Sequence, residues 1–297
     1  MIVTMGDSVT WGQGLLDIHK FDRLFAAGRD LTRIAHSGAT IGAKTDTSTE
    51  KVYPEVPVAH PSVWQQVLGF QDWADVDVVI LNGGINDVSL TRILNPLVPA
   101  TQVTQLTTQF CQEGMRALLK TAVGKLVKPE AKIAVVGYYP ILSEESFFEN
   151  ENQPRMLMEL HGVATSSVAL GTTFSVEGLI PAIEANCLAF WKTSDTALQA
   201  AVDAANECAG RDACVFVQVP FTEVNSMWAK HPLLWELSPL LDAEDEAEIK
   251  TLRDRACTEL YGDVVDALQW AKCDRASVGH PNVEGAAKIA AALTAAV

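Results

Sequence analysis

Basic side chains are scarce in this sequence. Among 297 residues there are 22 Lys and Arg against 37 Asp and Glu, which gives a formal net charge of −15. Sequence-independent binding to nucleic acid requires Lys and Arg to neutralise phosphates, so we expect no nucleic-acid partner. The same deficit weighs against docking on anionic membranes.

Long apolar runs are also missing. No stretch approaches the roughly 18 consecutive apolar residues of a membrane-spanning helix, and we expect no membrane span. The segment from Met1 to Met5 leads directly into a Gly-Asp-Ser turn, without the basic region, apolar region or cleavage site of an export signal. We therefore expect a cytoplasmic protein, or a secreted one if an export signal has been trimmed.

The cysteines lack the spacing of a metal site. There is no Cys-x-x-Cys pair and no histidine at zinc-finger distance, so we expect no bound metal. Three disulfides among six cysteines can form in about fifteen ways, and the sequence does not select one. Without a visible export signal, reduced and partly buried thiols are the favoured expectation. The six positions are Cys111, Cys187, Cys208, Cys214, Cys257 and Cys273.

Apolar residues are plentiful, at 48% of the chain, and gather in short runs. The length and this content suit one large core, and we expect a single domain over residues 1–297. Continuous Val and Ile runs are typical of strands covered on both faces, as in a parallel sheet. The five predicted strands are Ile2–Met5, Leu31–Ala35, Val76–Leu81, Lys132–Gly137 and Cys214–Val219.

Helical stretches separate or follow these strands. The predicted helices are Gln102–Val127, Ala182–Cys208, Asp242–Tyr261 and Pro281–Val297. Alternating strands and helices predict an α/β fold, a three-layer α/β/α sandwich around a five-stranded parallel sheet. Residues 141–212 exceed a simple crossover and predict a helical insertion. Its helices either form a lid or acyl-pocket wall, or pack as ordinary helices, which is the favoured interpretation.

Polar residues follow the first three strands. These strands end in Gly6-Asp7-Ser8, in Ser37-Gly38 and in Gly84-Ile85-Asn86-Asp87. In open parallel sheets, ligands bind at the carboxyl ends of the strands, so we expect these segments to meet at one rim. The sequence therefore predicts a functional site there.

A hydrolytic site needs a nucleophilic hydroxyl, a base and donors for a developing oxyanion. Ser8 can supply the hydroxyl. The backbone N–H groups of Ser8 and Gly38, with the side-chain amide of Asn86, can supply the donors. His280 opens a His-Pro-Asn sequence just before the last helix, where a loop can carry its ring over the rim as general base. Each motif alone is common in ordinary turns and helix starts.

The order of the four segments resembles the SGNH (GDSL-type) hydrolase family, whose name gives the residues that are here Ser8, Gly38, Asn86 and His280. The matching segments are Met5–Gly12, Ser37–Thr40, Asn82–Asp87 and Gly279–Asn282. The resemblance implies a flavodoxin-like fold. It also implies an esterase- or lipase-like enzyme that cleaves carboxylic esters through an acyl-serine intermediate, without a metal or organic cofactor.

One position departs from the family pattern. Members usually carry Asp three residues before the histidine, where this chain has Ser277. A main-chain carbonyl is the favoured substitute for orienting His280, Asp274 is the second alternative, and another acid is the third. The difference matters because neutralising the acid of a serine-protease triad costs about 10⁴ in kcat.

The substrate is only broadly indicated. The resemblance implies a small-molecule, carbohydrate-borne or lipid-borne acyl ester. Two alternatives to hydrolysis stay open. One is acyl transfer from the same acyl-serine to an acceptor other than water, and the other is a catalytically silent ligand-binding module on the same fold.

Overall fold

The central element is a sheet of five parallel strands in the order β2-β1-β3-β4-β5. The computed structural model describes residues 1–47, 52–150, 152–163, 176–238, 240, 242–262 and 267–297. The strands are β1 (Ile2–Met5), β2 (Leu31–Arg33), β3 (Val78–Leu81), β4 (Lys132–Val136) and β5 (Cys214–Val217). This order is the flavodoxin-like one, and the predicted five-stranded parallel sheet is confirmed.

The strands are shorter than their apolar runs. Val76 and Val219 are almost fully buried but lie outside the hydrogen-bonded ladder. Burial therefore continues beyond pairing, and hydrophobicity alone overestimates strand length. β1 and β3 are buried along their whole length, whereas β2 at the edge is only half-buried.

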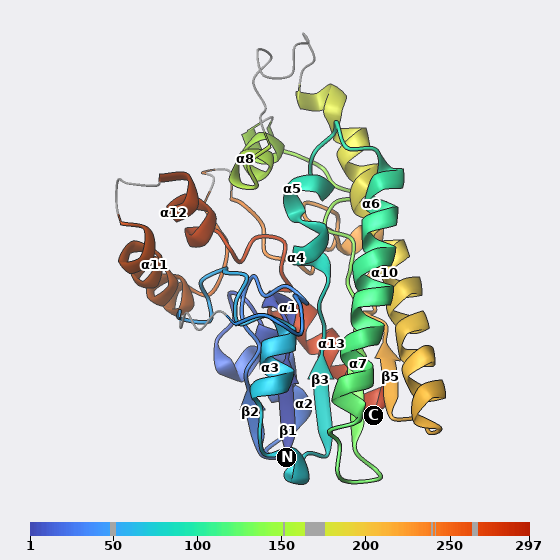
Figure 1. The fold of residues 1–297 in the computed structure, drawn as a ribbon. Coiled ribbons are helices and arrows are strands. Elements are labelled where there is room, and N and C mark those ends of the chain that lie inside the picture. The colour runs from blue at the N-terminus through green and yellow to red at the C-terminus, as the bar shows by residue number, and fades with distance from the viewer. Residues whose placement is uncertain (48–51, 151, 164–175, 239, 241, 263–266) are drawn as a thin grey trace.

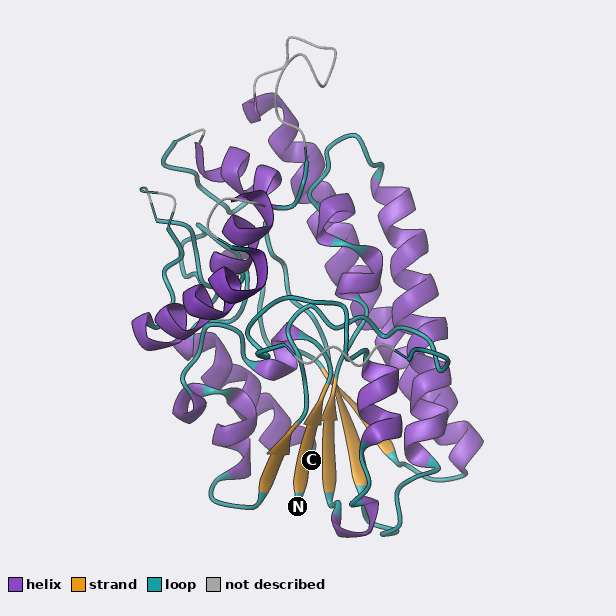
Figure 2. Ribbon diagram, turned by 60° about the vertical axis from the view of Figure 1, so that its left-hand side comes forward, coloured by secondary structure: helices purple, strands orange, loops and turns teal. Residues whose placement is uncertain are grey.

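Helices cover both faces of the sheet, as the three-layer prediction requires (Figures 1 and 2). α2 (Phe21–Ala26) contacts the C-terminal helix α13 (Val283–Ala296). A second group of helices, in mutual contact, comprises α6 (Ala100–Thr107), a π-helical stretch (Thr108–Gly114), α7 (Met115–Val123) and α10 (Ile180–Ala209). α3 (Val63–Gly69) contacts β1.

Short elements and loops gather beyond the carboxyl ends of the strands (Figure 2). They include α1 (Ser8–Trp11), α4 (Ile85–Val88), α5 (Leu90–Ile93), α8 (Asn152–Leu160), α11 (Ala247–Tyr261) and α12 (Ala267–Asp274). Single 3-10 turns lie at Asp17–His19, Trp73–Asp75, Val176–Leu179 and Glu223–Asn225. No helix in the described ranges combines the length and apolar character needed to cross a bilayer.

One disulfide corrects the expectation of reduced thiols. Cys257 of α11 and Cys273 of α12 are bonded, with their Cα atoms 5.8 Å apart. The expectation was wrong for this pair because it rested on the missing export signal, and no sequence spacing marked these two cysteines. The remaining cysteines are free thiols: Cys111, Cys187 and Cys214 are buried, and Cys208 is exposed.

Candidate active site

The Gly-Asp-Ser turn at the end of β1 fixes Ser8. Gly6 has a φ of +126°, and a Cβ there would lie 2.3 Å from Asn82 Oδ1, so no larger residue fits without a shift. Asp7 caps α1 by accepting the Val9 N–H at 2.9 Å. Ser8 is therefore the first residue of α1. Its N–H has no acceptor within the helix, as is general for a first turn.

A buried polar network joins the ends of three strands. Besides the Val9 N–H, the Asp7 carboxylate accepts hydrogen bonds from Asn82 Nδ2 at 2.9 Å and from the Tyr138 hydroxyl at 2.7 Å. The Tyr138 oxygen in turn accepts the Ile85 N–H at 3.2 Å. Burial raises the pKa of Asp7, and the three hydrogen bonds oppose that shift. Asp7 thus links the first turn to the segments after β3 and β4.

His280 reaches Ser8 from the opposite end of the chain. Its Nε2 lies 2.7 Å from Ser8 Oγ. Its Nδ1 lies 3.2 Å from the main-chain carbonyl oxygen of Ser277. The loop is held by Trp235, whose N–H donates to the His280 carbonyl at 2.7 Å and whose carbonyl accepts the Gly279 N–H at 2.9 Å.

The electrostatic setting keeps the imidazole of His280 neutral near neutral pH. Burial lowers its pKa to about 4, although the hydrogen bond to the Ser277 carbonyl works against this shift. In the tautomer that donates Nδ1–H to that carbonyl, the Nε2 lone pair faces the Ser8 hydroxyl. This arrangement can accept a proton from Ser8.

The other two predicted residues lie at the same rim. Gly38 has a φ of +78°, and a Cβ there would lie 2.6 Å from the Val58 nitrogen, so glycine is required by both conformation and space. Asn86 Nδ2 donates to the Ala39 carbonyl at 3.0 Å, which ties the loop after β3 to the loop after β2. The carboxylate of Asp87 strengthens this connection by accepting the Ile41 N–H at 2.8 Å.

A pocket of about 220 Å³ is lined by all four predicted residues, Ser8, Gly38, Asn86 and His280. A smaller cavity of about 30 Å³ adjoins Ser8 and His280 and has mainly apolar walls. The fold thus brings together side chains from four distant segments beside one space that can hold a ligand.

Residues without a sequence signal complete the pocket wall. Leu157 and Leu160 of α8, together with His161, line the larger pocket. This part of the predicted 141–212 insertion therefore forms a pocket wall, whereas α10 packs against α6 and α7 as an ordinary helix. Lys272 and Arg275 also line the pocket. No motif around Lys272 or Arg275 in the sequence predicts that they line the pocket.

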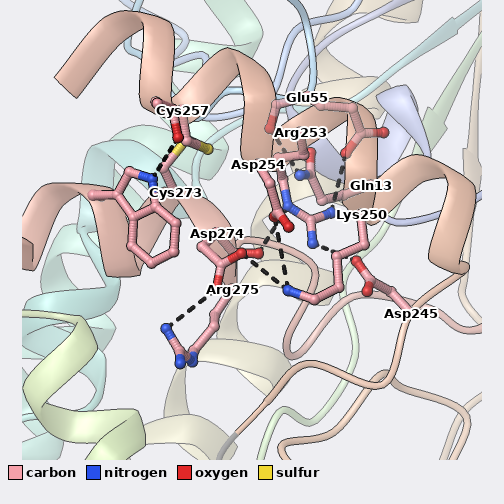
Figure 3. Close-up of a disulfide and its surroundings, with 12 residues drawn as sticks. Gln13, Glu55, Asp245, Lys250, Arg253, Asp254, Cys257, Cys273, Asp274 and Arg275 are labelled. Atoms are coloured by element: carbon pink, nitrogen blue, oxygen red, sulfur yellow. Dashed lines mark hydrogen bonds and ion pairs between the residues drawn. A yellow bond between two sulfur atoms is a disulfide. The ribbon is translucent and has the colours of Figure 1, made fainter. Parts of the chain in front are cut away.

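Asp274 does not occupy the position of an orienting acid. Its carboxylate pairs with Lys250 at 3.0 Å and with Arg275 at 3.2 Å, and its carbonyl accepts the Arg253 Nε–H at 2.9 Å (Figure 3). His280 Nδ1 instead faces the Ser277 carbonyl. The alternative that assigned this role to Asp274 therefore does not fit the geometry, because the carboxylate is turned to the cations between α11 and α12.

Ser277 contributes its main chain to the site. The residue is fully buried, and its Oγ has no hydrogen-bond partner among the residues that the structure describes.

Among the described residues, no group of three or more His, Cys, Asp or Glu side chains could hold a metal ion.

Comparison with known proteins gives one structural neighbour to report. No family model matches the chain, and no curated protein matches it. The crystal structure of an extracellular lipase from Streptomyces rimosus superposes with a TM-score of 0.52 at 16% identity, over 100% of this chain and 99% of that chain. The chain shares the fold of that lipase. At this identity the likeness establishes the lipase fold alone, because one fold can carry many functions.

Proposed function

We propose that this protein is a carboxylic ester hydrolase of the esterase or lipase type, with Ser8 as nucleophile and His280 as general base. The observation that carries the proposal is the 2.7 Å distance between Ser8 Oγ and His280 Nε2. Such a contact is the geometric requirement for activating a serine hydroxyl. The lipase fold and the resemblance to SGNH hydrolases support the same reaction class.

In the proposed acylation half-reaction, Ser8 Oγ attacks the ester carbonyl carbon while its proton passes to His280 Nε2. The N–H groups of Ser8 and Gly38 and the amide of Asn86 donate hydrogen bonds to the resulting oxyanion. The tetrahedral intermediate then breaks its bond to the alcohol oxygen. That oxygen takes the proton from His280, which leaves an acyl-serine and the free alcohol.

In the proposed deacylation half-reaction, His280 removes a proton from water as the water oxygen attacks the acyl-serine. The second tetrahedral intermediate expels Ser8 Oγ, which recovers the proton from His280. The products are the carboxylic acid and the original enzyme. The Ser277 carbonyl is proposed to hold the Nδ1–H and orient the ring throughout. It offers a dipole but no negative charge, and so stabilises the imidazolium less than an aspartate does.

The pocket walls suggest the class of ester. Leu157, Leu160 and Val278 provide apolar surface beside Ser8 in a pocket of about 220 Å³. We propose that the acyl group is short or of medium length, on a small-molecule, carbohydrate-borne or lipid-borne ester.

The lipase comparison covers 100% of this chain, which supports one domain for the whole sequence.

The Cys257–Cys273 disulfide indicates the redox environment in which the protein is located. Structural disulfides persist in oxidising environments and are rare in the cytosol. This bond supports a secreted or otherwise oxidising location over the cytoplasmic one that the sequence alone favoured.

Hydrolysis of p-nitrophenyl esters from acetyl to decanoyl tests the function. We expect turnover by the wild type and a loss of at least ~10³-fold in Ser8→Ala, since removing a nucleophile leaves only oxyanion and binding contributions. Ser238→Ala, a serine outside the pocket lining, is the matched control. Turnover that survives in Ser8→Ala contradicts the assignment, and absence of turnover in the wild type favours a silent binding module. Ester products formed with added alcohols would indicate acyl transfer.

A further inference from the structure

The charge of the pocket opposes that of the chain as a whole. Acidic residues outnumber basic ones by 37 to 22 over the sequence. Among the described residues that line the larger pocket, however, are Lys272 and Arg275 but no Asp or Glu. A local reversal of charge beside a nucleophile is a means of attracting and positioning an anionic ligand.

Lys272 is a partly buried cation of this pocket. It makes no hydrogen bond or ion pair with any residue that the structure describes. By contrast, Arg33 pairs with Asp22 at 2.7 Å, and Lys250 pairs with Asp274 at 3.0 Å. Burial lowers the pKa of Lys272, because a half-buried ammonium is poorly solvated. A bound anion would compensate for that lost solvation.

Arg275 adds a second positive charge to the same pocket. Its guanidinium pairs at 3.2 Å with the carboxylate of Asp274, the last residue of α12 (Figure 3). The planar guanidinium suits recognition of carboxylate or phosphate groups.

His161 is a further polar residue of the pocket. It lines both the larger pocket and the small cavity beside Ser8. Burial, with the charge of Lys272 as a smaller cause, lowers its pKa to about 3, so the ring is neutral near neutral pH. Its Nδ1 has no hydrogen-bond partner among the described residues.

We propose that the ester cleaved at Ser8 carries an anionic group, a carboxylate or a phosphate, and that Lys272 binds this group with Arg275 beside it. The inference rests on the proposed hydrolase function and narrows its substrate class. Because both cations share the pocket with Ser8 and His280, the anion and the scissile ester belong to one small molecule or to one end of a larger one.

Matched ester pairs provide the test, each read as a ratio of kcat/KM for the anionic member to that for the neutral one. The acyl-side pair is mono-p-nitrophenyl adipate and p-nitrophenyl hexanoate, since shorter hemiesters hydrolyse spontaneously through cyclic anhydrides. The alcohol-side carboxylate pair is 4-acetoxyphenylacetate and its amide. The alcohol-side phosphate pair is 2-(4-acetoxyphenyl)ethyl phosphate and its parent alcohol. The three pairs distinguish the position and the kind of anion.

We expect the wild type to prefer the anionic member of at least one pair by about tenfold or more. Lys272→Met should bring that ratio close to one, Lys272→Arg should retain most of it, and 0.5 M NaCl should reduce it through screening. Lys288→Gln, which removes an exposed lysine of α13 that pairs with Glu284, should leave the ratio unchanged.

The outcomes separate this inference from the function on which it rests. Ser8-dependent hydrolysis without preference for any anionic member, or a preference that Lys272→Met retains, overturns the anion site and leaves the hydrolase. No Ser8-dependent hydrolysis of any ester overturns both. Both kcat/KM values of a pair are measured on the same protein sample. A partial loss of folded protein therefore lowers both values equally and leaves their ratio unchanged.

Discussion

His280 Nε2 lies 2.7 Å from Ser8 Oγ, although 272 positions separate the two residues in the chain. Ser8 begins the helix that follows β1, and His280 precedes the last helix, which packs on the sheet beside α2. The contact therefore depends on the whole parallel sheet, and it explains why two ordinary local motifs form one site.

The pH profile should show an unusually acidic lower limb. Burial lowers the pKa of His280 to about 4, so the ring stays neutral and basic at pH values where an exposed histidine is already protonated. We expect kcat/KM to be retained down to about pH 5 and to fall as the pH drops through about 4. The profile should be measured with a neutral ester whose own ionisation does not change. A limb near pH 6.5 contradicts the buried setting of this ring.

Replacement of Asp274 should have little effect on catalysis. Its carboxylate pairs with Lys250 and Arg275, and Nδ1 of His280 faces the Ser277 carbonyl instead. We expect Asp274→Asn to change kcat/KM for p-nitrophenyl butyrate by less than tenfold while lowering Tm. Loss of a true triad acid costs about 10⁴ in kcat, and a decrease of that size in well-folded Asp274→Asn would restore the alternative that the geometry disfavours.

Tyr138→Phe should lower the free energy of unfolding and leave the charge of the pocket unchanged. The Tyr138 hydroxyl donates to Oδ2 of the buried Asp7 carboxylate and accepts the Ile85 N–H, so its removal takes one hydrogen bond from each of these buried groups. We expect a loss of about 1–3 kcal/mol in the free energy of unfolding, measured by urea denaturation. The matched control is Tyr139→Phe, because that hydroxyl makes no hydrogen bond to a described residue. Equal effects of the two variants would contradict the role given to the network.

Loss of the disulfide should loosen the segment that carries the site's cations. Cys257 and Cys273 are 16 positions apart, and cross-linking a loop of this length contributes about 3 kcal/mol in the chain-entropy description. We expect the double variant Cys257→Ala/Cys273→Ala, or the reduced wild type, to unfold at a lower urea concentration. Cys208→Ala, at an exposed free thiol, should behave as the wild type. Identical denaturation curves for all these proteins would show that the bond is absent or energetically neutral.

The sheet could be predicted because its strands are covered on both faces. Val78 to Leu81 are all buried, and such continuous apolar runs appear directly in the sequence. Strand ends were less predictable, since Val76 and Val219 are buried without pairing in the ladder. The residues that meet at the rim could be found as well, because parallel strands place their carboxyl ends together.

The rest of the site carried no comparable sequence signal. Main-chain atoms such as the Ser277 carbonyl are the same in every residue, so no sequence pattern distinguishes this carbonyl from Asp274 as the partner of His280. Lys272 and Arg275 enter the pocket through the packing of α12, and the disulfide likewise depends on how α11 and α12 meet. These features are tertiary, and neither composition nor spacing encodes them locally.

The central claim is that His280 activates Ser8 as a nucleophile, and covalent labelling measures this most directly. Diisopropyl fluorophosphate phosphorylates an activated serine with loss of fluoride, and peptide mass spectrometry then locates the adduct. We expect one adduct per chain, on Ser8, in the wild type, a labelling rate at least ~10³-fold lower in His280→Ala, and none on that peptide in Ser8→Ala. An adduct elsewhere, or equal labelling rates in wild type and His280→Ala, would contradict the account.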